Sequence, residues 1–374
     1  MNDEYYMRRA LELAKLGMGH TSPNPMVGAV IVKDGRIIGE GYHERCGSLH
    51  AERSALAHCG ADPRGAVMYV TLEPCCHHGR QPPCTDAILA AGISRVVVGS
   101  GDPNPLVAGR GIEILRSHGV EVTEHVLSGE CEALNAVFFH YIRTGMPYAA
   151  LKYAMTLDGK IAAYTGESKW ITGTAAREHV HRLRGTMPDN FMSEMETTIS
   201  QIAGLADDPL LTCRIPGGRD PVRIVCDSAL RTPLGSNLVR TARETPLIIA
   251  TLCTDDARTA PYVDAGCEVI TLPARDGHID LSALMRELGR REIDGLLIEG
   301  GATLNWSALE AGLARRVYAY IAPKLLGGTA AKSPIGGLGF PSPGAGTELS
   351  IERTERLGDD ILLECEVKQS CSQE

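Results

Sequence analysis

Short apolar segments alternate with helical segments along almost the whole chain, and this alternation constrains the fold more than any other feature of the sequence. In the first third, we expect strands at 27–32, 36–41, 67–71 and 96–99, and helices beginning near residue 50 and at 84–91, 111–118 and 129–143. Strands that alternate with helices predict a layered α/β domain.

The segment Gly145-Met146-Pro147 interrupts this pattern, and we place a domain boundary there, between residues 1–145 and 146–374. Strand signals then resume, at 148–154, 222–226, 246–250, 268–272, 295–299, 316–321 and 361–367. Helical segments such as 281–290 lie between several of them, so we expect a second α/β domain with a mostly parallel sheet. The glycine- and proline-rich stretch 327–346 is expected to be a surface loop.

The composition argues against several classes of partner. A formal net charge of −9 argues against a general nucleic-acid-binding protein, which would carry a basic stripe. No run of roughly 18–20 apolar residues is present, so we expect no membrane span and no membrane partner. The 12 cysteines, in a sequence whose start lacks a signal-peptide core, predict a cytoplasmic protein with free or metal-bound thiols.

A metal-binding pattern stands in the first third of the chain. His50 and Glu52 are expected at a helix start, Cys75 follows a strand, and Cys84 opens the next helix. Zinc prefers nitrogen and thiolate ligands, and a catalytic site keeps three protein ligands and one open position. His50, Cys75 and Cys84 supply that set for one zinc ion, and Glu52 can carry a proton from water to leaving ammonia. This order of residues is the signature of zinc-dependent nucleobase deaminases.

Other interpretations of these residues stay open. A His-x-Glu pattern alone favours a purely structural cluster, whereas the strand–Pro-Cys–helix order and the preceding Pro23-Asn24-Pro25 loop favour catalysis. The second cysteine comes nine residues after the first, where many deaminases have Pro-Cys-x-x-Cys. Cys76, His77 and His78 are therefore rival ligands. We favour Cys84, because a helix start stabilises a thiolate.

Longer motifs run through both halves of the chain. Those in the first half are Asn24–Ala29, His50–Glu52 and Thr71–Thr85, the last of which contains Gly79-Arg80-Gln81-Pro82-Pro83-Cys84. Those in the second half are Lys152–Ala154, Leu157–Lys160, Gly166–Gly173, His181–Arg184, Asp207–Thr212 and Glu299–Gly301. Together they resemble the bifunctional deaminase/reductases of riboflavin biosynthesis, and the resemblance covers nearly the whole chain.

This resemblance implies an N-terminal three-layer domain of the cytidine deaminase type and a C-terminal α/β domain similar to dihydrofolate reductase. It implies two consecutive reactions on a small phosphorylated pyrimidine. The first is zinc-dependent deamination of a diaminopyrimidinone ribosylamine phosphate, and the second is NADPH-dependent reduction of its ribosyl group to ribityl. Such reductase domains commonly pair, so a homo-oligomer, either a dimer or a tetramer, is implied as well.

The resemblance also implies roles for individual residues. The implied substrate contacts are Asn24, Ser168, Arg184, Leu211, Arg214 and Glu299. The implied NADPH contacts are Ala154, Trp170, Thr198, Asp207, Ser228, Gly301, Ala302, Thr303, Leu304, Asn305, Trp306 and Ser307. Trp170, one of only two tryptophans, could equally be a core residue.

Two of these assignments have a physical argument of their own. Gly300 and Gly301 follow an apolar strand and precede a helix, so the backbone can approach a phosphate that helix N–H groups bind. No Gly-x-Gly-x-x-Gly follows an early strand, so a Rossmann fingerprint is not the basis of this argument. The alternative is a purely structural turn, because strand–Gly-Gly–helix turns are often structural. Arg184 and Arg214 can each grip a phosphate with two hydrogen bonds. Composition alone would make both of them solvated surface arginines.

One segment departs from the family pattern. After Arg184 such proteins have an apolar strand and a glycine turn, whereas here Glu194 and Glu196 replace the glycines. Carboxylates repel NADPH phosphates, so either residues 187–206 lie away from the cofactor or the reductase is weakened. We expect the reductase to work, because its other motifs are intact. The threonine that contacts the cofactor is Thr197 or Thr198, and we favour Thr198.

Two rival functions belong to other classes. A tRNA or nucleoside deaminase would carry Pro-Cys-x-x-Cys and, for tRNA, a basic surface, and this chain has neither. A zinc-stabilised scaffold would not need Glu52, so replacing that residue discriminates between a scaffold and an enzyme.

Overall fold

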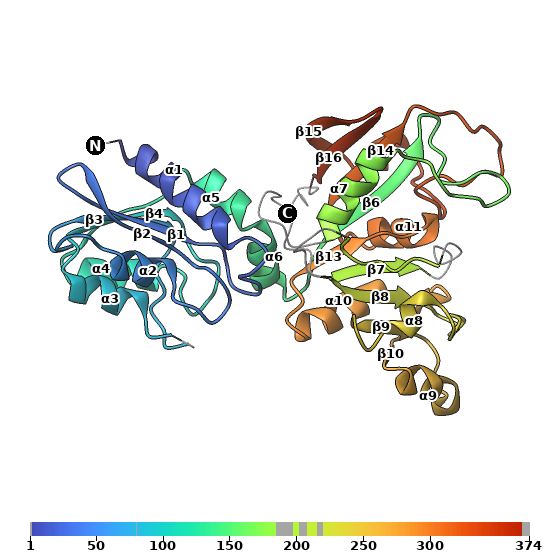
Figure 1. Ribbon diagram of the computed structural model, residues 1–374, viewed down its shortest axis with the longest axis horizontal. Coiled ribbons are helices and arrows are strands. Elements are labelled where there is room, and N and C mark those ends of the chain that lie inside the picture. The colour runs from blue at the N-terminus through green and yellow to red at the C-terminus, as the bar shows by residue number, and fades with distance from the viewer. Residues whose placement is uncertain (1, 80, 185–196, 202–207, 215–219, 369–374) are drawn as a thin grey trace. The chain divides into compact units, whose positions relative to one another are not determined.

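The computed structural model describes residues 2–79, 81–184, 197–201, 208–214 and 220–368. The chain forms two compact units that meet in sequence between Gly145 and Met146 (Figure 1). Each unit has its own sheet and its own buried apolar clusters. Within the described residues, no helix is both long enough and apolar enough to cross a membrane.

The first unit is built on a five-stranded sheet in the order β2-β1-β3-β4-β5. Its strands are β1 (Gly28–Lys33), β2 (Arg36–Tyr42), β3 (Val67–Leu72), β4 (Arg95–Ser100) and β5 (Glu121–Thr123). Its helices are α1 (Asp3–Ala14), α2 (Ala51–Ala57), α3 (Cys84–Ala91), α4 (Arg110–Ser117), α5 (Ser128–Leu134) and α6 (Ala136–Thr144). β1 is antiparallel to β2 and β3, and the β3–β4 and β4–β5 pairs are parallel.

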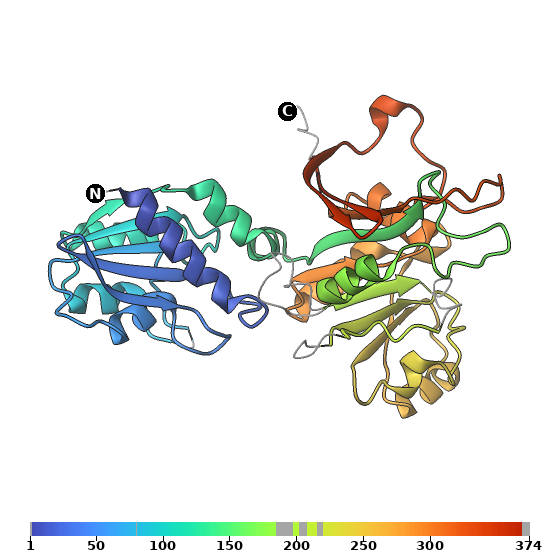
Figure 2. The same cartoon turned by 45° about the horizontal axis from the view of Figure 1, so that its top comes forward.

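Side chains of β1 point alternately to the two faces of this sheet. Val30 and Val32 join the apolar cluster beneath α1, whereas Ala29 and Ile31 join the cluster that includes Ile88 of α3. Figures 1 and 2 show α1 and α5 on one face and α2, α3 and α4 on the other. The unit therefore has three layers, as the family resemblance implied.

The expected single helix at 129–143 is wrong, because the chain forms α5 and α6 with a break at Asn135. The Asn135 side chain is fully buried and binds the backbone of Met26 twice. Met26 N donates to its Oδ1 over 2.8 Å, and its Nδ2 donates to Met26 O over 2.9 Å. This contact joins segments that are distant in sequence and fixes the break between the two helices. The local sequence pattern around residue 135 does not predict the break.

The second unit has a nine-stranded sheet in the order β10-β9-β8-β7-β13-β6-β14-β16-β15. Its strands are β6 (Tyr148–Thr156), β7 (Thr197–Gln201), β8 (Val222–Cys226), β9 (Leu247–Thr251), β10 (Glu268–Thr271), β13 (Gly295–Ile298), β14 (Ala314–Ala322), β15 (Leu349–Leu357) and β16 (Asp360–Val367). Its helices are α7 (Thr174–Arg184), α8 (Asn237–Arg240), α9 (Asp256–Asp264), α10 (Leu281–Arg290) and α11 (Ala302–Glu310). Two short strands, β11 (Ala274–Arg275) and β12 (His278–Ile279), form a separate hairpin.

All pairs from β10 to β14 are parallel, and only β14–β16 and β16–β15 are antiparallel. Val317 and Ala319 of β14 join the cluster that contains α10 and α11 residues, while Tyr320 faces α7 through a hydrogen bond to His179. The sheet is thus covered on both faces. In an open parallel sheet, ligands bind beyond the carboxyl ends of the strands, and Glu299 directly follows the carboxyl end of β13.

Candidate active sites

Three ligand-type side chains converge in the first unit. His50 occupies the N-cap position of α2, Cys84 is the first residue of α3, and Cys75 follows β3. Two helix N-termini therefore meet at this point, and their partial positive charge favours negatively charged sulfur.

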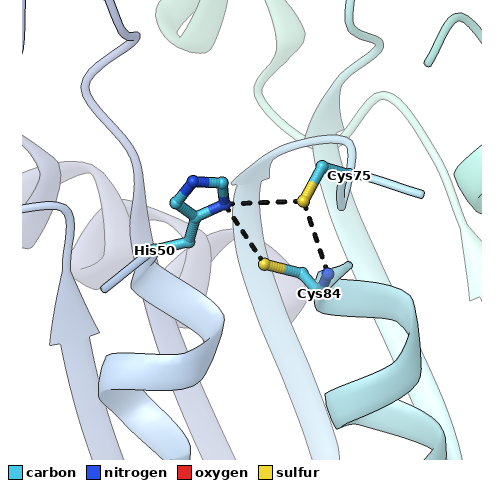
Figure 3. A group of neighbouring side chains, drawn as sticks. All are labelled: His50, Cys75 and Cys84. Carbon is cyan, nitrogen blue, oxygen red and sulfur yellow. Dashed lines mark hydrogen bonds between the residues drawn. The ribbon is translucent and has the colours of Figure 1, made fainter. Parts of the chain in front are cut away.

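The three ligand atoms lie at the spacing that a zinc ion requires (Figure 3). His50 Nδ1 is 3.5 Å from Cys75 Sγ and 3.4 Å from Cys84 Sγ, and the backbone N–H of Cys84 donates to Cys75 Sγ over 3.4 Å. A nitrogen about 2.0–2.1 Å and a sulfur about 2.3 Å from one tetrahedral zinc lie about 3.5 Å apart. The donor set and its spacing both fit zinc.

The protonation of these ligands suits a metal. A hydrogen bond from the Cys84 thiol lowers the pKa of Cys75, and a hydrogen bond from His50 adds to that effect. The pKa of Cys84 rises in turn, because its thiol donates a hydrogen bond to the Cys75 sulfur and burial disfavours a second thiolate. The hydrogen bond to Cys75 also raises the pKa of His50. A cation that replaces these shared protons would be held by two thiolates and a neutral imidazole.

Glu52 stands in the first turn of α2, two residues after His50. Its side chain is only 4% exposed. Burial raises the pKa of Glu52 to about 7, and the nearby Cys75 sulfur adds to that rise. A carboxyl group with a pKa near neutrality can both accept and donate a proton, which is what an acid/base catalyst needs.

The rival ligands do not join this group within the residues that the structure describes. Its members are His50, Cys75 and Cys84 alone. The Cys76 thiol points to the carbonyl of Leu106 at 3.6 Å.

Asn24, the expected substrate contact, lies beside a histidine. Asn24 Nδ2 is 3.2 Å from His43 Nε2, and His43 Nδ1 is 3.0 Å from the carbonyl oxygen of Leu49. A carbonyl only accepts, so His43 Nδ1 carries the proton and Nε2 accepts from Asn24. Burial lowers the pKa of His43, and its ring packs edge-on against His50 at 5.5 Å between centroids.

The second unit brings three charged side chains together. Glu299 directly follows β13, Lys152 lies on the neighbouring β6, and Arg184 is the last residue of α7. Lys152 Nζ is 3.2 Å from Glu299 Oε2, Arg184 Nη2 donates to the same oxygen over 2.8 Å, and Arg184 Nε donates to Oε1. The side chains of Lys152, Arg184 and Glu299 are 15%, 13% and 7% exposed.

The two neighbouring cationic groups favour the ionised form of Glu299. Burial alone would raise the pKa of Glu299, but Arg184 and Lys152 outweigh it and lower the pKa to about 2. Burial also lowers the pKa of Lys152, which Glu299 opposes only in part. A surface position is therefore wrong for Arg184, whereas Arg214 is exposed. Glu299 accepts from Nε and Nη2 of Arg184, so this side of the guanidinium is paired with a carboxylate inside the protein.

The 301–307 segment forms the N-cap and first turns of α11. Leu304, Asn305 and Trp306 are buried, and Asn305 Nδ2 donates to the carbonyl of Pro334 over 2.9 Å. The side chains of these three residues therefore pack inside the second unit. The first intrahelical hydrogen bond runs from Asn305 N to Gly301 O, so the N–H groups at the helix start have no intrahelical acceptor. Backbone groups are what this segment can offer to a phosphate.

The other expected contacts lie in different surroundings. Ala154 is half-buried on β6, and Ser228 follows the carboxyl end of β8. Ser168 is half-buried, and Leu211 is buried in the cluster beside β8 and β9. Trp170 is 65% exposed, so a core position is wrong; its ring stacks on Arg177, with the guanidinium carbon 4.5 Å from the centroid.

Parts of the expected cofactor site lie outside the described residues. This holds for Asp207, Glu194 and Glu196, and the altered segment 187–206 is described only at 197–201. There the chain forms β7, in which the backbone of Thr198 lies between Leu297 of β13 and Arg223 of β8.

Sequence reasoning gave no role to Lys152 or His43. Lys152 has a recognisable signal, since a lysine inside an apolar strand has to be paired when it is buried. His43 follows a strand and has no distinctive spacing, so only the structure connects it to Asn24.

A three-layer α/β unit with a His-Cys-Cys group beside a buried glutamate defines a zinc-dependent nucleobase deaminase, here joined to a second α/β unit. Family models agree with this class. Residues 1–100 match the model "Cytidine and deoxycytidylate deaminase zinc-binding region", and residues 147–363 match the model "RibD C-terminal domain".

Similar proteins extend the match to nearly the whole chain. The riboflavin biosynthesis protein RibD of Actinobacillus pleuropneumoniae is 53% identical over 97% of this chain and 95% of its own length. A solved structure of Acinetobacter baumannii RibD is 36% identical, with a TM-score of 0.85, and covers 98% of this chain and 99% of that one. A deaminase/reductase structure from Thermotoga maritima is also 36% identical, with a TM-score of 0.84, and covers 98% of this chain and 99% of that one.

The chain belongs to the RibD family of riboflavin biosynthesis proteins. It is a bifunctional enzyme, with a zinc-binding deaminase domain followed by a reductase domain.

Proposed function

We propose that residues 1–145 deaminate 2,5-diamino-6-(5-phosphoribosylamino)pyrimidin-4-one and that residues 146–374 then reduce the ribosyl group of the product with NADPH. The final product would be 5-amino-6-(5-phosphoribitylamino)uracil. The Thermotoga maritima protein is described as a diaminohydroxyphosphoribosylaminopyrimidine deaminase and 5-amino-6-(5-phosphoribosylamino)uracil reductase. The observation that carries the proposal is the convergence of His50, Cys75 and Cys84 beside the buried Glu52.

In the deaminase site, His50, Cys75 and Cys84 hold one zinc ion. When bound, zinc supplies a water molecule that is activated near neutral pH. Glu52 accepts a proton from the attacking water and donates a proton to the amino group as it leaves as ammonia. Its raised pKa supports both directions of transfer.

Asn24 and His43 orient the pyrimidine. The His43 ring holds Asn24 Nδ2, which leaves the carbonyl oxygen of Asn24 to accept from an amino group of the substrate. Because burial lowers the pKa of His43, the ring stays neutral and keeps this acceptor role at physiological pH.

In the reductase site, Glu299 binds the ribose hydroxyls, and Arg184 and Lys152 keep its carboxylate ionised and in place. When bound, NADPH supplies the hydride. Reduction also places a proton on the sugar oxygen, and Lys152 is the acidic group beside Glu299 that can donate it. The exposed side chain of Arg214 binds the substrate phosphate, and Ser168 contributes a further contact to the substrate.

In this proposal, residues at the carboxyl ends of strands in the second sheet would hold NADPH. The N–H groups at the start of α11, from Gly301 to Leu304, bind a phosphate of the cofactor. Ala154 on β6 and Ser228 after β8 would contact the cofactor, Thr198 and Asp207 are further proposed contacts, and the exposed ring of Trp170, which stacks on Arg177, would cover it.

The setting of the protein follows from the same residues. A zinc site built on Cys75 and Cys84 needs reduced thiols, and a reducing compartment keeps them so. We therefore place the enzyme in the cytoplasm, and we propose that it works as a homo-oligomer, a dimer or a tetramer.

Selective metal removal tests the proposal. The purified protein, stripped of zinc with a chelator, should release no ammonia from the diaminopyrimidinone substrate but should still oxidise NADPH with the deaminated substrate. Added zinc should restore ammonia release. Full ammonia release from metal-free protein would contradict the zinc site, and an unreactive deaminated substrate would contradict the reductase assignment.

A further inference from the structure

Two consecutive prolines, Pro82 and Pro83, stand immediately before the zinc ligand Cys84. Proline has no backbone N–H, so these residues cannot anchor the segment by donating hydrogen bonds. Their carbonyl groups remain as acceptors. A donor from elsewhere in the fold is therefore needed to fix the chain that delivers Cys84.

Arg53 supplies that donor from α2, the helix that begins at the ligand His50. Its Nε donates to the carbonyl of Pro82 over 3.2 Å, and its Nη2 donates to the carbonyl of Pro83 over 2.8 Å. The planar guanidinium presents donors in a fixed fork, so one side chain can hold both carbonyls at once. Arg53 is half-buried, and Pro83 and Cys84 are buried beneath it.

Arg53 lies on α2, the helix that also begins with the ligand His50 and carries Glu52. His50 is the N-cap of that helix, Glu52 lies in its first turn, and Arg53 follows directly. The start of α2 thus carries the ligand His50, the acid/base group Glu52, and Arg53, whose hydrogen bonds hold the segment that precedes Cys84. Other contacts that hold this end of the segment are 3.2 Å or longer: Gln81 Nε2 donates to Gly47 O over 3.4 Å, Cys84 N donates to Cys75 Sγ over 3.4 Å, and Thr85 N donates to Cys75 O over 3.2 Å.

We propose that Arg53 is a positioning residue that fixes Cys84 relative to His50 and thereby slows the loss of zinc from the site. The inference rests on the proposed zinc site. Eight residues separate Cys75 from Cys84. Without the two hydrogen bonds from Arg53, this segment could shift and carry Cys84 away from His50 while Cys75 stayed in place. Residues that orient metal ligands typically change metal affinity or activity by about 10–100-fold when they are replaced.

The experiment measures zinc transfer from the holoenzyme to an excess of a chromogenic chelator. Arg53→Met keeps the length of the side chain and removes both donors, and Arg53→Lys keeps the charge and one donor group. We expect zinc release to be about 10–100-fold faster in R53M and intermediate in R53K. Turnover of the deaminated substrate with NADPH should be unchanged in both, because that reaction takes place in the other unit.

Arg116→Met is the matched control. Arg116 lies on α4 of the same unit, and its Nη2 also donates to a backbone carbonyl, that of Val122, over 3.1 Å. Its replacement should leave zinc release at the wild-type rate. Equal release rates in R53M and wild type would overturn the inference while leaving the proposed function intact. A wild-type protein that binds no zinc would overturn both.

Discussion

Arg184 and Glu299 form a two-pronged ion pair inside the second unit, 115 residues apart in sequence. The two Glu299 oxygens accept from Nε and Nη2 of Arg184, and Lys152 approaches one of them at 3.2 Å. All three side chains are largely buried. The carboxylate is therefore the counter-charge for two cations that water can barely reach.

Replacing Glu299 with Gln should destabilise the second unit by about 3–5 kcal/mol, because it leaves two buried cations without their counter-charge. Both tryptophans, Trp170 and Trp306, lie in this unit, so tryptophan fluorescence during urea unfolding reports on it selectively. Glu310→Gln on the exposed end of α11 is the control and should change stability by less than about 0.5 kcal/mol. Equal losses in both variants would contradict the buried ion pair.

The same pair predicts a pH dependence. The pKa of Glu299 is lowered to about 2, below the value of about 4.3 expected in an unfolded chain. A depressed pKa contributes stability above the unfolded value, and that contribution disappears as pH falls through the folded value. The stability gap between wild type and E299Q should therefore be constant above about pH 5 and shrink between about pH 4 and pH 2. A gap that widens with acid would have the wrong sign.

Zinc binding should distinguish neighbouring cysteines. Cys84→Ser should reduce bound zinc from one ion per chain to almost none under chelator challenge, because it removes one of three ligands. Cys76→Ser should retain the metal, since the Cys76 thiol points to Leu106 O and not to His50. Metal analysis of the two purified variants measures this directly. Loss of zinc in C76S with retention in C84S would reverse the ligand assignment.

Replacing Trp170 tests the proposed NADPH site. Its exposed ring stacks on Arg177 and is available to a nicotinamide or adenine face. Trp170→Ala should raise the KM for NADPH roughly tenfold, about 1.4 kcal/mol, and change the stability of the unit little. Trp170→Phe should recover part of the affinity. An unchanged KM in the alanine variant would remove Trp170 from the cofactor site.

How far the sequence predicts the fold depends on whether the signal is local. Strand β8 and helices α3 and α10 have the bounds that apolar periodicity indicated. Strand β15 was not anticipated, because Leu349–Leu357 alternates weakly and is exposed along most of its length at the edge of the sheet. The break at Asn135 depends on its contact with Met26, which no window of sequence around residue 135 contains.

The two sites differ in the same way. The zinc ligands belong to motifs with strong local context, so the sequence indicated them together. Lys152 and Glu299 meet because Leu151 of β6 pairs with Ile298 of β13 in the parallel sheet, which sets their next residues side by side. That register is a property of the assembled sheet. The sequence indicated Glu299 and Arg184 separately but not the ion pair that joins them.

The most direct measurement follows ammonia and NADPH together in wild-type protein and in Glu52→Gln. With the diaminopyrimidinone substrate, wild type should release ammonia first and oxidise NADPH after a lag, in equal final amounts. E52Q should keep its zinc yet release ammonia at least about 100-fold more slowly, and it should oxidise NADPH only when given the deaminated substrate. Ammonia release by E52Q at the wild-type rate, or NADPH oxidation that precedes ammonia, would contradict the two-step assignment.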